Sequence, residues 1–306
     1  MSFKWLSTLA VALTGLTSVQ AVAATPQNTL TLIPTSVWNP ANPSNPNSIE
    51  LRVYEPNNVK ANPAIILALH WCGSSGPEYF GATTYAQYAD EMGFVVLFPS
   101  SQKDNNCWDV ATPATLTRNG GGDSHDLSRI VAWAKGAYNA NPSKVFVTGT
   151  SSGCMMSNVM SATYPDLFDA MSCYSGVSAG CLAGSPGSSP TTADPTCAMG
   201  NNIKTPAQWK AVAQAMYPGY TGKYPRIMTI HGDQDFFVHI KNFEEQLKQW
   251  SAIHGESLKQ TKVNTPFAGW TKYKYGNGKN LVGYKVAGVG HFVLAEEQLD
   301  LSWFGL

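Results

Sequence analysis

Short, almost uninterrupted apolar runs recur along the chain and alternate with segments of helical periodicity. The runs are rich in β-branched and aromatic residues, are bounded by turn residues, and lie at 64–69, 94–98, 145–147, 170–174 and 226–230. Such runs are typical of parallel strands covered on both faces, because a strand with one solvated face alternates apolar and polar residues. We therefore predict buried parallel strands at these five places.

Helical patterns fill the spaces between these strands. From Asp126 onward, apolar residues at 3.6-residue spacing fall on one face, before Asn141-Pro142 ends the pattern: Leu127, Ile130, Val131, Ala134 and Tyr138. Segments 152–164 and 243–253 are also helix-like. The alternation predicts an α/β fold, with a mostly parallel sheet flanked by helices.

The 306 residues suit one domain after a leader that we expect to be removed. Residues 1–24 contain Lys4, an apolar uncharged stretch and the small residues Ala21-Val22-Ala23, which is the pattern of a secretory signal peptide. The apolar stretch is short for a membrane span. No internal repeat marks a second domain, and the Asn/Pro-rich segment 35–48 is interpreted as a turn after a first edge strand. We predict a secreted protein whose residues 25–306 form one domain.

The balance of charge excludes partners that depend on a strong electrostatic field. Lys and Arg number 20, as do Asp and Glu, so we expect no binding to nucleic acid or to an anionic membrane. Only 13% of residues are charged and 11% are aromatic, which suits either an uncharged ligand such as a sugar polymer or simply a neutral surface. We expect a monomer.

Six cysteines follow the predicted signal peptide, so disulfides are permitted. We favour a bridge between Cys181 and Cys197, which bracket a Ser/Pro/Gly-rich loop, and then one between Cys72 and Cys107, which would join two loops that follow strands. The other two cysteines are either buried thiols or a third bridge. None has zinc-like spacing, so the sequence predicts no metal site.

The segment Gly149-Thr150-Ser151-Ser152-Gly153 lies between a predicted strand and a predicted helix. A serine exposed at such a sharp turn takes a strained backbone conformation, and glycines two residues before and after it let neighbouring backbone approach. The helix start adds a partial positive charge. We predict that Ser151 is a nucleophile.

A serine hydroxyl needs a base to accept its proton, and after this kind of turn the expected chain order is Ser, then Asp or Glu, then His. His291 follows a strand-like run and a glycine-rich turn near the C-terminus, and we prefer it to His239. His231 closes a strand and is assigned structural hydrogen bonds. His254 ends a polar helical run and is assigned to the surface.

Two acidic residues directly follow the predicted strand 226–230. Asp235 is preferred, since it lies far enough into the loop to turn back toward His291, whereas Asp233 can cap the turn. Its predicted role is to hold the imidazole tautomer and to stabilise the imidazolium.

A developing oxyanion needs hydrogen-bond donors, which we expect from the backbone N–H groups of Ser152 and Cys72. Ser152 follows the nucleophile, and Cys72 lies in the loop after an early strand, where Trp71 is the alternative donor. His70 is interpreted as a buried residue that shapes this loop.

The motifs ALHWCGSS, NNCWD, VTGTSSGCMM, HGDQD and VAGVGHF together resemble the secreted carbohydrate esterases that include acetylxylan and feruloyl esterases and are related to polyhydroxyalkanoate depolymerases. The resemblance covers nearly all of residues 25–306 and is greatest with fungal acetylxylan esterases. It implies a single-domain α/β-hydrolase with a Ser-Asp-His triad and no cofactor. Carried over by position, it supports these residues: Ser151, Asp235 and His291 as the triad, with Cys72 and Ser152 as oxyanion donors.

The leading hypothesis is a serine esterase that removes acetyl groups from xylan, with the polysaccharide held on the catalytic face. Trp108 and Trp270 are candidates to stack on sugar rings, although core packing suits each equally well. Feruloyl esterase and polyester depolymerase are alternatives with the same chemistry. A non-catalytic polysaccharide-binding protein is less favoured, because it has no need of a nucleophile, a base and an acid. A serine peptidase would use the same triad, but no segment indicates a peptide pocket.

Overall fold

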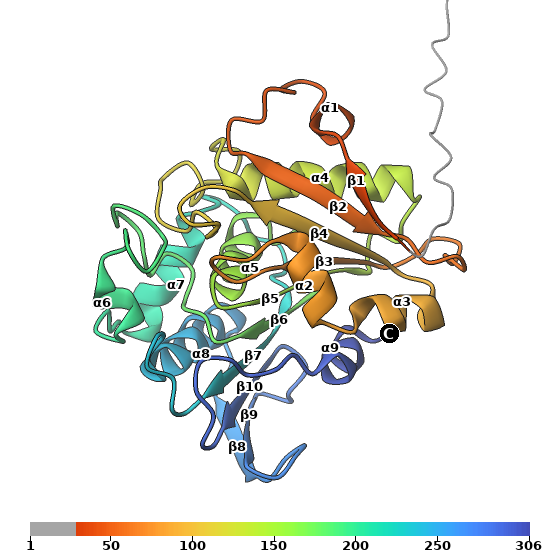
Figure 1. Cartoon of the computed structure of the whole chain (residues 1–306). Coiled ribbons are helices and arrows are strands. Elements are labelled where there is room, and N and C mark those ends of the chain that lie inside the picture. The colour runs from red at the N-terminus through yellow and green to blue at the C-terminus, as the bar shows by residue number, and fades with distance from the viewer. Residues whose placement is uncertain (1–28) are drawn as a thin grey trace, which may run out of the picture.

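A computed structural model describes residues 29–306, and the predicted signal peptide at 1–24 lies outside them. Within the described chain, ten strands form one sheet in the order β1-β2-β4-β3-β5-β6-β7-β10-β9-β8 (Figure 1). The strands are β1 (Leu30–Ile33), β2 (Ile49–Tyr54), β3 (Ile65–Leu69), β4 (Val95–Ser101), β5 (Val145–Thr150), β6 (Ala170–Tyr174), β7 (Arg226–Gly232), β8 (Leu258–Val263), β9 (Trp270–Tyr275) and β10 (Leu281–Val286).

The middle of the sheet is parallel and its two edges are antiparallel. Strands β4, β3, β5, β6, β7 and β10 run parallel to one another. At one edge β1 and β2 are antiparallel additions, and at the other edge β9 and β8 are. The five strands predicted from apolar runs are β3 to β7, all in the parallel part. The sheet is therefore mixed, and the predicted parallel arrangement describes its centre.

Helices cover both faces of the sheet (Figure 1). One layer contains α4 (Asp123–Ala137), α5 (Ser152–Thr163) and α8 (Lys241–His254), with α7 (Pro206–Gln214) packed against α5 and α8. The opposite layer contains α2 (Gly76–Ala82), α3 (Tyr85–Met92) and α9 (Glu297–Phe304). Two short helices, α1 (Thr35–Trp38) and α6 (Pro195–Ala198), lie in connections. No helix within residues 29–306 is long and apolar enough to cross a membrane.

Alternate side chains of the central strands enter separate cores on the two faces of the sheet. In β3, Ile65, Leu67 and Leu69 pack in the core under α4, α5 and α8, whereas Ile66 and Ala68 pack in the core under α2, α3 and α9. Successive side chains of a strand point to opposite faces, and here both faces are removed from water. This is why the central strands are apolar throughout and are recognisable from sequence.

The edge strands lack this signal. β8 is exposed along its whole length, and β9 alternates lysine with tyrosine. Charged side chains on an edge strand oppose pairing with other molecules, and they also remove the apolar run that predicts a strand. Strands β2, β8 and β9 were accordingly not predicted from the sequence. The Asn/Pro-rich segment 35–48 forms α1 and a series of turns between β1 and β2, as predicted.

Both favoured disulfides are present, and the remaining two cysteines form a third bridge rather than buried thiols. The described residues contain the pairs Cys72–Cys107, Cys154–Cys173 and Cys181–Cys197.

Opening the Cys181–Cys197 loop should measurably destabilise the protein. The two cysteines are 16 residues apart in sequence, and a crosslink of this span stabilises a fold by about 3 kcal/mol, chiefly by restricting the unfolded chain. We expect the double variant Cys181→Ser/Cys197→Ser to lose roughly that free energy of unfolding in urea titrations. An unchanged midpoint and slope would show that the bridge contributes no stability.

Candidate active site

Ser151 lies in a strained turn between β5 and α5. Its backbone angles are φ 55° and ψ −117°, in a region that residues other than glycine rarely adopt. A Cβ at Gly149 would lie 2.4 Å from the carbonyl carbon of Gly153, and a Cβ at Gly153 would lie 2.0 Å from the carbonyl oxygen of Leu69. Both positions of the motif therefore require glycine, because any side chain there would overlap nearby backbone. This close backbone contact holds the serine at the end of β5.

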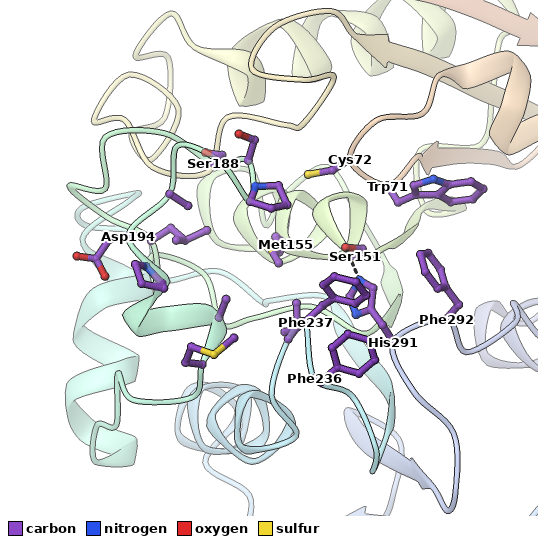
Figure 2. A pocket seen from close by; sticks show the side chains of 18 residues that line it. Trp71, Cys72, Ser151, Met155, Ser188, Asp194, Phe236, Phe237, His291 and Phe292 are labelled. Atoms are coloured by element: carbon purple, nitrogen blue, oxygen red, sulfur yellow. Dashed lines mark hydrogen bonds between the residues drawn. The ribbon is translucent and has the colours of Figure 1, made fainter.

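Ser151, His291 and Asp235 form one hydrogen-bonded chain. Nε2 of His291 lies 2.8 Å from Oγ of Ser151 (Figure 2). Nδ1 of His291 lies 2.8 Å from Oδ2 of Asp235. The three residues follow β5, β10 and β7, which run parallel with β6 between β5 and β7. Because the carboxyl ends of parallel strands meet at one edge of the sheet, loops far apart in sequence converge there.

The Asp235 carboxylate is buried and accepts four hydrogen bonds. Oδ1 accepts from the backbone N–H groups of Phe237 (2.9 Å) and Val238 (2.8 Å). Oδ2 lies within 2.8 Å of His291 and 3.0 Å of His231. Burial by itself raises the pKa of Asp235, but the hydrogen bonds from the two histidines and from Val238 outweigh it and hold the pKa well below its usual range. The group is therefore a carboxylate at neutral pH.

The contact between His231 and Asp235 was not foreseen from the sequence. His231 is fully buried, and its Nε2 lies near both Oδ2 of Asp235 and, at 2.8 Å, the carbonyl oxygen of Val238. Its Nδ1 has no hydrogen-bond partner among the described residues. Since only Nε2 faces acceptors, we place the ring hydrogen there. The assignment to structural hydrogen bonds is correct, but the partner is the carboxylate itself; the signal was the four-residue spacing within HGDQD.

The rejected candidates lie apart from this chain. Oδ1 of Asp233 accepts from the N–H of Gly288 at 2.8 Å, so this residue does secure a turn. Nδ1 of His239 accepts from the N–H of Lys241 at 3.2 Å. His254 was assigned to the surface, which is wrong: it is half-buried beside Trp250.

Backbone N–H groups that could receive an oxyanion lie beside Ser151. Ser152 is the first residue of α5, so its N–H is at the positive end of the helix dipole. Cys72 lines the cleft next to Ser151, as does Trp71. Within residues 29–306, the N–H groups of Ser152 and Cys72 donate to no protein acceptor. They are available to a ligand.

Neither tryptophan proposed for sugar stacking reaches the cleft. Trp108 is fully buried, where its Nε1 donates to the carbonyl oxygen of His70 at 3.0 Å. Trp270 is buried against Tyr284 and Phe267. Both rings pack inside the protein, so the stacking hypothesis is wrong for both.

His70 has the structural role that was predicted. It is fully buried, and burial lowers its pKa to about 4, which keeps the ring neutral. Its Nε2 accepts from the N–H of Ser101 at 3.0 Å, so the hydrogen is on Nδ1, which donates to the carbonyl oxygen of Trp71 at 2.7 Å. These bonds fix the loop that carries Cys72.

A cleft of about 320 Å³ opens at Ser151 (Figure 2). Its lining is mostly apolar, with Met155 beside the serine, the disulfide-closed loop 181–197 on one side and aromatic side chains near His291. The charged or titratable side chains in the lining are Asp194 and His291. The described residues contain no group of three His, Cys, Asp or Glu side chains placed to hold a metal ion. The cleft suits an uncharged organic ligand.

This arrangement is characteristic of serine hydrolases with the α/β-hydrolase fold. In them a parallel sheet carries a serine on a strained strand-to-helix turn, and later strand ends supply a histidine and a carboxylate. The family model of the prolyl oligopeptidase family, which has this fold, matches residues 81–259. Acetylxylan esterase A of Aspergillus oryzae (strain ATCC 42149 / RIB 40) is 44% identical over 264 residues, which cover 85% of this chain and 85% of the relative.

Two further relatives agree with this result. Feruloyl esterase B of Talaromyces stipitatus is 41% identical over 262 residues, covering 86% of this chain and 73% of that protein. The solved structure of an acetyl xylan esterase from Aspergillus awamori superposes with a TM-score of 0.83 at 41% identity, covering 90% of this chain and 99% of that one. The chain belongs to the family of these acetylxylan and feruloyl esterases.

Removing the charge of Asp235 should abolish most activity without unfolding the protein. Asp235→Asn can no longer stabilise an imidazolium at His291, and we expect kcat to fall by about 10³- to 10⁴-fold on an activated ester. Asp233→Asn is the matched control, because this nearby carboxylate has no histidine partner. Equal losses in the two variants would contradict the assignment of Asp235.

His231 should influence turnover through Asp235. Loss of a hydrogen bond to a carboxylate costs about 1.5–3 kcal/mol, so we expect His231→Ala to lower kcat by about tenfold or more with little change in KM. His231→Gln keeps an N–H donor near Nε2 and should recover most of the rate. Met228→Ala, another buried change in β7, controls for destabilisation. A kcat loss in Met228→Ala as large as in His231→Ala would assign the effect to folding.

Proposed function

We propose that this protein is a secreted serine esterase, acting as a monomer, that removes acetyl groups from acetylated xylan. The observation that carries the proposal is the hydrogen-bonded chain Ser151–His291–Asp235 in a protein 44% identical to an acetylxylan esterase. A preceding signal-like segment at 1–24 and three disulfides support secretion, since disulfides persist in oxidising compartments.

The reaction proceeds through an acyl-enzyme. Oγ of Ser151 attacks the ester carbonyl carbon while Nε2 of His291 accepts its proton. The tetrahedral intermediate collapses, the bond to the sugar oxygen breaks, and His291 returns the proton to that oxygen. Water then attacks the acetyl-serine with His291 again as base, which releases acetate and restores Ser151. Asp235 stabilises the imidazolium in both halves of the reaction.

The oxyanion is stabilised by the N–H groups of Ser152 and Cys72. Their lack of protein acceptors supports this role, because each can donate when negative charge develops on the carbonyl oxygen. Such a donor is worth about 3 kcal/mol of transition-state stabilisation. The Cys72–Cys107 disulfide and the hydrogen bonds of His70 keep the Cys72 loop in place.

Feruloyl ester hydrolysis is the second candidate. The cleft of about 320 Å³ is lined by Met155, Leu182 and Phe237 and is within the size range of pockets for organic ligands, so it can hold more than an acetyl group. The 41% identity to feruloyl esterase B supports the same alternative.

The two candidates are distinguished by assaying acetate release from acetylated xylan and ferulate release from methyl ferulate, with wild type beside Ser151→Ala. We expect acetate release that is lost in the variant, because Ser151 supplies the nucleophile. Ferulate release with little acetate would favour the second candidate. Activity on both substrates that persists in Ser151→Ala would contradict the mechanism.

A further inference from the structure

Large aromatic side chains are exposed at the mouth of the cleft. Phe236 is 71% exposed, Phe292 is 60% exposed and Phe237 is 51% exposed, and the half-buried Trp71 lies beside Phe292. Exposed apolar residues are ordinary when scattered, but a cluster of them marks an interaction surface. We call these four side chains the aromatic rim.

The aromatic rim and the ring of His291 together form a row that passes through the site (Figure 2). The ring centroids of Phe236 and Phe237 are 4.4 Å apart, and Phe237 lies 5.5 Å from His291. Phe292 lies 5.2 Å from His291 on its other side and 6.5 Å from Trp71. The row therefore joins three loops, after β3, β7 and β10, and borders the Ser151–His291 pair.

The cleft can enclose only part of a polymeric substrate. About 320 Å³ is at the lower end of the range for pockets that enclose a single small organic ligand. The rest of a chain of many sugar units must lie outside it. Exposed side chains on the loop 181–199 also border the opening, but the large aromatic ones are those of the aromatic rim. The rim carries no charge, which suits a neutral chain.

We propose that the aromatic rim is the docking surface for the polysaccharide chain, with the C–H faces of pyranose rings packed on Phe236, Phe292 and Trp71 while the ester reaches Ser151. The inference rests on the proposed function, since it requires a polymeric substrate. Aromatic side chains offer large, flat apolar area at a low entropic cost, because they have only two rotatable side-chain bonds. These three residues replace Trp108 and Trp270 as the sugar-stacking candidates.

The test compares the polymer with a small ester in the same variants. For Phe236→Ala and Phe292→Ala, we expect the ratio of kcat/KM on acetylated xylan to kcat/KM on p-nitrophenyl acetate to fall by about three- to tenfold each. Phe267→Ala is the matched control, because Phe267 is a 44% exposed phenylalanine that does not line the cleft. Its ratio should equal that of wild type. An unchanged ratio in both rim variants would overturn the proposal.

Binding is measured separately from catalysis with the Ser151→Ala variant, as the amount of this protein that stays bound to insoluble xylan after washing. Retention that disappears when Phe236→Ala and Phe292→Ala are added supports the docking surface, and retention that persists overturns it. The proposed function would be refuted if the wild type hydrolysed p-nitrophenyl acetate but released no acetate from xylan. In that case the retention assay would still decide whether the aromatic rim binds xylan. Capture by phosphatidylcholine vesicles without capture by xylan would assign the rim to a lipid surface and overturn the proposal.

Discussion

The close approach of backbone around Ser151 is the constraint on which the rest of the site depends. The turn has φ 55° and ψ −117°, a conformation that costs on the order of 1–3 kcal/mol. It persists because Ser151 donates its N–H to the carbonyl oxygen of Tyr174 at 2.8 Å, and its own carbonyl oxygen accepts from Met155 at 2.9 Å. Gly153 presses against β3, so a side chain there would push α5 away from the sheet. Once the turn is fixed, the positions from which a histidine can reach Oγ are few.

Tyr174 connects this turn to the loop that carries His291. Its hydroxyl donates to Asp300 at 2.9 Å and accepts from the N–H of Glu296 at 3.0 Å. Asp300, on α9, also accepts from Tyr85, and burial raises its pKa to about 7 against the effect of these hydrogen bonds. One buried tyrosine thus contacts the strained serine through its carbonyl group and, through its hydroxyl, the segment that follows the histidine. The C-terminal helix is in this way part of the support of the site.

In the mechanism that we propose, reaction chemistry and substrate choice depend on different parts of the fold. The hydrogen-bonded chain of Ser151, His291 and Asp235 is held by strand ends and by four donors to one carboxylate. The cleft walls are loops, among them the disulfide-closed segment 181–197 and the loops that carry the aromatic rim. One fold can therefore carry different substrate preferences, because loops vary more readily than the strands that position a site.

The sequence by itself determined the features that depend on near neighbours in the chain. The strands β3 to β7 appear as apolar runs because both of their faces are buried, and Ser151 stands out because its turn requires glycines at fixed spacing. Chain order narrowed the candidates, and position in loops after predicted strands then selected Asp235 and His291, which lie within hydrogen-bond distance of each other. Only the tertiary structure decided which aromatic side chains are buried, that His231 contacts Asp235, and where β8 and β9 extend the sheet. Burial depends on side chains brought together from several elements, and a contact depends on how the backbone turns between the two residues, so the order of residue types alone did not reveal them.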